Sequence, residues 1–171
     1  MPVNKKIFSP VIIAFISLAF AISGCNYKFR DVSIPPEIQT VKINFIENRA
    51  PYVNPQLSQL LTNQLQQKVV NQTRLSRTNN DDAHYDISGF ISQYSISTSG
   101  ISNQQTTTNR LTVGVHITLE DRVNNTTKEF DISRPFDFSA QTSLQEAEAR
   151  LNDEIVRNIT DEIFNRIFSN W

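Results

Sequence analysis

The 171-residue sequence contains little glycine and almost no histidine or cysteine, and each shortage excludes a class of site. Its four glycines are too widely spaced to form either of the glycine-rich loops that cradle phosphate groups. Two histidines, His84 and His116, and the single Cys25 supply neither a zinc cluster nor an intrachain disulfide. No nucleophile–base or hydrolase motif occurs. We therefore expect no metal, no cofactor and no enzymatic activity.

Charge is also scarce. Charged residues make up 19% of the chain, against about 25% in an average domain. The formal net charge is −1 and the pI is about 6.1, so no basic footprint for nucleic acid is present. In their place, Asn, Gln, Ser and Thr account for 59 of the 171 residues. This composition suits a protein that works outside the cytoplasm or against a polar surface.

The N-terminal segment has the pattern of a secretory signal. Lys5 and Lys6 precede an apolar core at Val11–Ile22, which is too short for the roughly 20 residues that span a bilayer. The core ends in Ile22-Ser23-Gly24-Cys25, which resembles the bacterial lipobox, with cleavage between Gly24 and Cys25 and lipid on the Cys25 thiol. The alternative is an ordinary signal peptide or an anchor helix with an incidental cysteine.

Three segments follow from this interpretation. We expect a lipoprotein signal peptide at residues 1–24, a lipidated tether at 25–36 and a folded domain at 37–171. Several acyl chains on one cysteine anchor a protein stably. Asn26 rather than Asp follows the cysteine, which favours the outer membrane, and no acidic run follows, which favours its periplasmic face.

Hydrophobic periodicity places two helices and four strands in the domain. The strands are expected at Ile38–Ile46, Tyr85–Thr98, Leu111–Leu119 and Thr127–Ile132, and the helices at Pro55–Asn71 and from Ser143 to about Ser169. Asn54 and the Ser143/Glu146 capping box mark the helix starts. A bulge is expected at Gly89, where the strand pattern changes phase, with Tyr85, Ile87 and Ile91 on one face and Phe90, Tyr94 and Ile96 on the other. The order β-α-β-β-β-α predicts a two-layer α+β fold, with a four-stranded, mainly antiparallel sheet.

Few polar residues stand out as binding candidates. On the second helix, three carboxylates precede an arginine by four residues, which is typical of a solvated, ion-paired face: Glu146–Arg150, Asp153–Arg157 and Glu162–Arg166. Lys42, Arg49 and Arg110 are candidate contacts for phosphate groups or for a partner. The segment Ser92–Asn109 is nearly all Ser, Thr, Asn and Gln. It is either a long exposed hairpin or a surface that packs in a polar barrel lumen or against a sugar-rich ligand.

The mature sequence resembles the LptE family of lipopolysaccharide-assembly lipoproteins, in the form typical of Bacteroidota. The similarity rests on the order and spacing of short motifs. These are Ser33-Ile34-Pro35-Pro36, Thr40–Ile43, Asn48–Pro55, Asn109–Val113, and the ending Asp161–Asn165 with Asn170-Trp171. The resemblance implies a lipoprotein that plugs an LptD-type outer-membrane β-barrel and assists lipopolysaccharide assembly. It brings no catalytic residue, and only Cys25 carries over, as the lipid attachment site.

A second class shares the same features. A periplasmic regulatory lipoprotein, or one that serves an ABC transporter, would also have a signal, a tether and no catalytic set. Co-purification with a large β-barrel distinguishes the two classes.

Overall fold

The structure is a computed structural model that describes residues 34–102 and 105–169. Its elements are β1 (Thr40–Ile43), β2 (Glu47–Asn48), α2 (Leu57–Gln72), β3 (Ser76–Arg77), β4 (Tyr85–Ser102), β5 (Gln105–Asp121), β6 (Thr126–Ser139) and α3 (Leu144–Phe168). The longer elements follow the expected order β-α-β-β-β-α. The predicted signal peptide, and most of the predicted tether, lie outside the described residues.

The sheet differs from the expected four-stranded, mainly antiparallel one, which was wrong in both number and direction. Six strands form it, in the order β3-β1-β4-β5-β6, with β2 also paired to β4. β1 runs parallel to both β3 and β4, and β2 runs parallel to β4, whereas β4–β5 and β5–β6 are antiparallel. The sheet is therefore mixed.

The predicted strand Ile38–Ile46 is interrupted in the structure, and this interruption creates the short β2. After β1, the backbone N–H of Ile46 donates to Thr62 Oγ1 of α2 at 3.0 Å instead of to a strand. The chain then returns to β4, where the N–H of Arg49 donates to the Ile91 carbonyl at 2.9 Å. A side-chain bond from a helix thus separates β1 from β2, which lies just beyond the end of the predicted strand.

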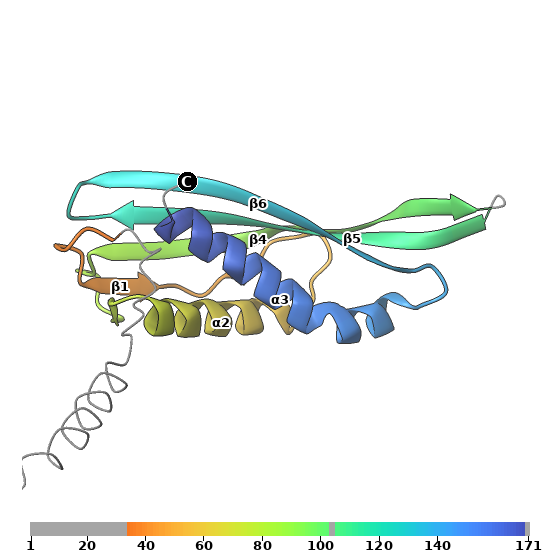
Figure 1. Cartoon of the computed structure of the whole chain (residues 1–171), viewed down its shortest axis with the longest axis horizontal. Coiled ribbons are helices and arrows are strands. Elements are labelled where there is room, and N and C mark those ends of the chain that lie inside the picture. The colour runs from red at the N-terminus through yellow and green to blue at the C-terminus, as the bar shows by residue number, and fades with distance from the viewer. Residues whose placement is uncertain (1–33, 103–104, 170–171) are drawn as a thin grey trace, which may run out of the picture. The chain divides into compact units, whose positions relative to one another are not determined.

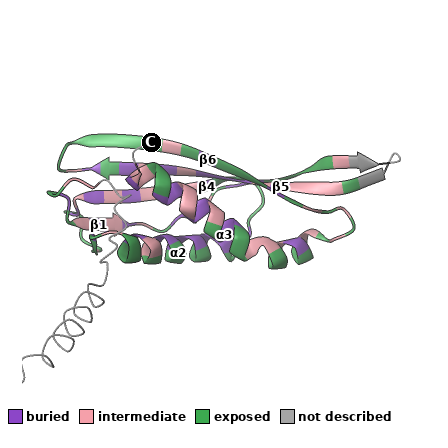
Figure 2. Cartoon of the chain, viewed as in Figure 1, coloured by how far each residue is buried: buried purple, intermediate pink, exposed green. Residues whose placement is uncertain are grey.

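Both helices pack on one face of the sheet, with α3 crossing the strands and α2 beside β1 (Figure 1). Alternate residues of β5 form the centre of the core, and their neighbours on the strand face the other way. The core residues of β5 are Leu111, Val113, Val115, Ile117 and Leu119, each at most 4% exposed. Buried positions of the helices face the sheet, and exposed ones face solvent (Figure 2). Within residues 34–102 and 105–169, no further layer covers the sheet face opposite the helices.

The β4–β5 hairpin continues beyond the end of β6, as a two-stranded extension (Figure 1). Pairing between β5 and β6 ends at Thr108 and Ser139. From Ser95 to Ser99 every residue of β4 is exposed. The segment Ser92–Asn109 thus forms a hairpin that is exposed in this chain, and packing of its surface in a barrel lumen or against a sugar-rich ligand stays a prediction.

The bulge in β4 lies at Ser92 rather than at Gly89. Ile91 pairs with Val115 and Gln93 with Gly114, so Ser92 is the extra residue on its strand. This extra residue reverses the alternation, and Tyr94 consequently lies on the same face as Ile91, buried to 4% exposure. The expectation that Tyr94 faces away from Ile91 was wrong for this reason.

Gly89 has a different role, in the close approach of β4 and β5. A Cβ at this position would clash with the backbone carbonyl oxygen of His116 and would lie 2.7 Å from Cδ1 of Ile117. The backbone oxygen cannot rotate away, so the two strands would have to separate.

We expect Gly89→Ala to lower the free energy of unfolding by about 2 kcal/mol, because overpacking forces the backbone to shift. Gly100→Ala is the matched control, since its Cβ would meet only Thr107 and Thr108 side chains, the nearest at 3.1 Å. Urea denaturation of both variants measures the difference. Equal stabilities would show that the strands can separate at no cost.

The two helix starts differ in how well they follow the predicted signals. α2 begins at Leu57, two residues later than predicted, and its N-cap residue Gln56 makes no side-chain cap bond. Asn54 Oδ1 accepts hydrogen bonds just before the helix, from the backbone N–H of Gln56 at 3.0 Å and of Leu57 at 3.3 Å. Ser143 Oγ accepts from the N–H of Glu146 at 3.3 Å, which confirms the predicted cap of α3. Among the described residues, neither helix combines the length and apolar character needed to cross a bilayer.

Candidate functional site

The sheet face that the helices leave uncovered is the main candidate surface, and we call it the open face. The strand register arranges it as five rows across β4, β5 and β6. These are Ser88–Thr118–Glu129, Phe90–His116–Asp131, Gln93–Gly114–Ser133, Ser95–Thr112–Pro135 and Ser97–Arg110–Asp137. Six of these fifteen residues are Ser or Thr and carry a hydroxyl group. On β4 and β5, Arg110 and His116 are the only ionisable members of these rows.

The second row is the most tightly connected. His116 Nδ1 lies 2.8 Å from Asp131 Oδ1, and the His116 ring is 5.2 Å from the ring of Phe90. The Arg49 guanidinium lies over the Phe90 ring, 4.5 Å from its centroid. The row therefore combines a cation–π contact, an aromatic contact and a hydrogen bond to a carboxylate, across three strands and the residue that follows β2. Sequence reasoning placed Phe90 correctly on the face opposite Ile91, but it did not single Phe90 out as a site residue.

Each of the three predicted contact cations lies on the open face beside an acidic partner. Lys42 Nζ is 2.6 Å from Asp81 Oδ1, and Arg49 Nη2 is 2.9 Å from Glu47 Oε2. Arg110 binds Asp137 through two bonds, of 2.7 and 2.9 Å. These hydrogen bonds lower the pKa of Asp81 and of Asp137. The three cations are therefore partly neutralised by the protein itself.

The same three cations are too far apart to share one phosphate group. Their neighbours on β4 are Asp86 for Lys42, Phe90 for Arg49 and Ser97 for Arg110. At about 3.3 Å per residue, these positions are separated by about 13 and about 23 Å along the strand. A contact of any one of them with lipopolysaccharide stays a prediction. Gly24 and Cys25, the predicted cleavage and lipidation site, lie outside the described residues.

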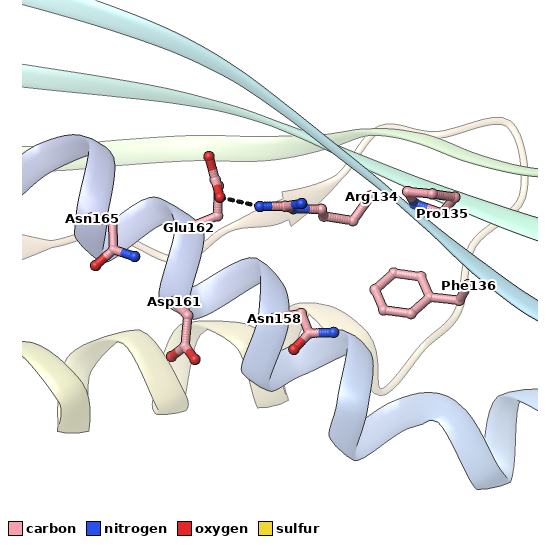
Figure 3. Close-up of a pocket in the computed structure, with 7 residues that line it drawn as sticks. All are labelled: Arg134, Pro135, Phe136, Asn158, Asp161, Glu162 and Asn165. Atoms are coloured by element: carbon pink, nitrogen blue, oxygen red, sulfur yellow. Dashed lines mark hydrogen bonds and ion pairs between the residues drawn. The ribbon is translucent and has the colours of Figure 1, made fainter. Parts of the chain in front are cut away.

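On the helix side, a groove of about 450 Å³ lies between β6 and α3 (Figure 3). Arg134 forms an ion pair with Glu162, which also accepts from Arg166 Nε at 3.1 Å. These bonds, the one from Arg134 above all, lower the pKa of Glu162. Asp161 is paired with Lys68 of α2 at 2.9 Å. Because each acid has a basic partner, the groove connects β6, α3 and α2 and offers no free charge to a ligand.

The remaining acidic side chains give no metal site. Over residues 34–102 and 105–169, no three His, Cys, Asp or Glu side chains come together as metal ligands. Two of the three expected helix pairs, Glu146–Arg150 and Glu162–Arg166, are present at 2.5 and 3.1 Å, whereas Asp153 and Arg157 do not form the third. Glu148 departs from the expected solvated face, since it accepts a hydrogen bond from Tyr94 of β4.

Comparison with known proteins agrees with this architecture. A family model described as LptE, lipopolysaccharide-assembly, matches residues 38–167. The rare lipoprotein B from Shewanella oneidensis has a similar fold, with 14% identity, a TM-score of 0.51, and coverage of 74% of this chain and 92% of that one. A minor lipoprotein from Acinetobacter baumannii is 17% identical over 77% of this chain and 97% of its own, with a TM-score of 0.43. No curated protein matches the chain.

Proposed function

The chain belongs to the LptE family of lipopolysaccharide-assembly lipoproteins, and from this premise we propose that it sits inside an LptD-type outer-membrane β-barrel. There it helps lipopolysaccharide reach the cell surface, without catalysing a reaction. The family works with LptD in this assembly and is not enzymatic. We further propose that Cys25 carries the lipid that holds the chain at the periplasmic face of the outer membrane.

One observation carries the barrel proposal, and it is the chemistry of the open face. Large membrane barrels have polar, water-filled interiors. A surface inside such a lumen must exchange hydrogen bonds with water and with polar walls. The six hydroxyls of the open face can donate and accept such bonds with no charge to desolvate. Arg110 and Arg49, the arginines beside these hydroxyls, are each paired with a carboxylate of the same face.

The test combines barrel recovery with measurement of surface lipopolysaccharide. We expect a pull-down of the full-length chain from detergent-solubilised outer membrane to recover an LptD-like barrel. We expect depletion of the protein to reduce surface lipopolysaccharide labelling, with accumulation further inside the cell. If no such barrel is recovered and surface labelling stays normal, the proposal is wrong, and the regulatory or ABC-transporter lipoprotein takes its place.

A pair of matched double variants tests the open face itself. Ser95→Glu with Thr112→Glu places two carboxylates in one row of that face. Gln67→Glu with Asn71→Glu places the same two charges on the exposed surface of α2. Because charge buried against a barrel wall must be desolvated, we expect the first pair to reduce barrel recovery about tenfold and the second to leave it unchanged. Equal recovery of the two would show that the open face does not contact the barrel.

A further inference from the structure

A cavity of about 520 Å³ lies on the helix side, where the segment before α2 meets the first turns of α3. Its lining includes Tyr52, Asn54, Gln56, Gln145, Glu148 and Asn152. The cavity is separate from the open face and from the ion-paired groove between β6 and α3. No role has so far been derived for these residues beyond the cap that Asn54 gives to α2.

An aromatic platform forms one wall of this cavity. The rings of Tyr52 and Tyr94 are stacked, with centroids 5.4 Å apart and planes 20° from parallel. Tyr94 is 4% exposed and belongs to the core, whereas Tyr52 is 44% exposed. The inner ring thus supports the outer one, and the outer ring keeps aromatic surface free to receive a ligand.

Hydrogen bonds hold the platform in position. The Tyr94 hydroxyl donates to Glu148 Oε1 at 2.7 Å, and the Tyr52 hydroxyl lies 3.4 Å from Glu148 Oε2. Asn54 Nδ2 lies 3.4 Å from both the Tyr94 hydroxyl and Asn152 Oδ1. Burial raises the pKa of the Tyr94 hydroxyl well above its usual range, so it remains a donor at neutral pH. The wall is therefore built before any ligand arrives.

The polar part of the cavity consists of amides and one carboxylate. Amide side chains from α3 and from the segment before α2 line it, and each amide can both donate and accept. Among the hydrogen bonds of the described residues, the side chains of Gln56 and Gln145 have no partner. No lysine or arginine lines the cavity, and Glu148 is its only acid.

We propose that this cavity binds an uncharged pyranose unit of a glycan. An aromatic face attracts the partly positive C–H groups on one side of a sugar ring, because its own face is partly negative. Amides and a carboxylate at the rim match the hydroxyl groups around the same ring. The absence of a cation from the lining disfavours phosphate and carboxylate ligands, and a single carboxylate is too few for a metal ion. The residues that line this cavity do not belong to the open face, so sugar binding here does not require barrel binding.

Two sources of uncharged sugar share this chemistry. One is a hexose oligosaccharide, and the other is a polymer of N-acetylhexosamine. Maltotriose represents the first and chitotriose the second. We expect the full-length chain, purified in a polyoxyethylene detergent that contains no sugar, to bind one or both with a Kd in the millimolar range by titration calorimetry. The tighter ligand then identifies the source.

Three substitutions test the platform. Tyr52→Ala removes the outer ring, and we expect it to raise Kd about tenfold. Tyr52→Phe keeps the ring and loses only the 3.4 Å contact with Glu148, so it should stay within about threefold of the native chain. Val53→Ala changes an exposed neighbour that does not line the cavity, and we expect no change in Kd.

Three results would overturn the proposal. They are no binding of either sugar at tens of millimolar, equal binding by Tyr52→Ala and the native chain, and displacement of the sugar by inorganic phosphate. Circular dichroism of Tyr52→Ala checks that a loss of binding does not come from unfolding. Barrel recovery is measured on the same variant. Sugar binding without a barrel would contradict the proposed function alone, and a barrel without sugar binding would contradict this inference alone.

Discussion

Val115→Asp is expected to unfold the domain, or to leave it only marginally stable. Val115 is 1% exposed and lies on β5, between Ile91 of β4 and Ile132 of β6. An aspartate there would leave an unpaired carboxylate among aliphatic side chains. Such a burial costs on the order of 4 kcal/mol or more, which approaches the whole stability of a small domain.

Thr112→Asp is the matched control on the same strand. Thr112 lies on the open face between Ser95 and Pro135, where a carboxylate stays in contact with water. We expect a loss below about 1 kcal/mol for this variant. Chemical denaturation of both variants in the full-length chain measures the difference. If Val115→Asp melted at the same temperature as the native chain, this face of β5 would not be the core.

Cys25→Ser is expected to abolish lipidation and stable residence in the membrane. The charged start, the short apolar core and Ile22-Ser23-Gly24-Cys25 motivate this prediction. A serine hydroxyl is a far weaker nucleophile than a thiol, so the acyl acceptor is lost and the precursor should stay uncleaved. Each buried methylene contributes about 0.8 kcal/mol to membrane binding, and loss of several acyl chains removes many of them.

Metabolic labelling with palmitate, followed by fractionation of the membranes, measures this effect. Ser23→Ala is the control, because it keeps a small residue beside the cleavage site and leaves the thiol in place. We expect it to be labelled like the native chain. Labelling that persists in Cys25→Ser would show that the lipid is attached elsewhere, and that the lipobox interpretation is wrong.

The fold was predictable where local pattern decides the structure. Alternation over Leu111–Leu119 predicts β5 correctly, because one face of that strand is buried and the other is open. The hydrogen bonds of Asn54 and Ser143 act within three residues, and this local chemistry predicts the start of α3 and places that of α2 to within two residues. In each case, the cause lies in neighbouring residues.

The fold was not predictable where distant residues decide it. The two-residue strands β2 and β3 are too short to produce a period, and their pairing depends on β4 and β1. The Ser92 bulge has no glycine to mark it, and it becomes visible only through the register with β5. The direction of β1 follows from the α2 connection that brings it beside β4.

The candidate sites, too, were predictable where neighbouring residues form the contact and not where distant residues do. The pairing of Arg49 with Glu47, two residues before it, is local and could be expected from the sequence. The partners of Lys42 and Arg110 are 39 and 27 residues away, so their neutralisation requires the folded sheet. The Tyr52–Tyr94 platform was missed because the bulge was misplaced, which put Tyr94 on the wrong face.

The interior position of β1 determines the order in which the chain can fold. β1 is the first described strand to be synthesised, yet it lies between β3 and β4. β1 pairs with β3 from Ser76 onward and with β4 from Tyr85 onward. Its apolar side chains therefore have no strand to pair with until those residues have been synthesised. β4, β5 and β6 pair as consecutive hairpins, which close faster than distant contacts. We therefore expect docking of β1 against β4 to be the slow step of folding. The N-terminal segment is then the part that a chaperone would have to shield in the meantime.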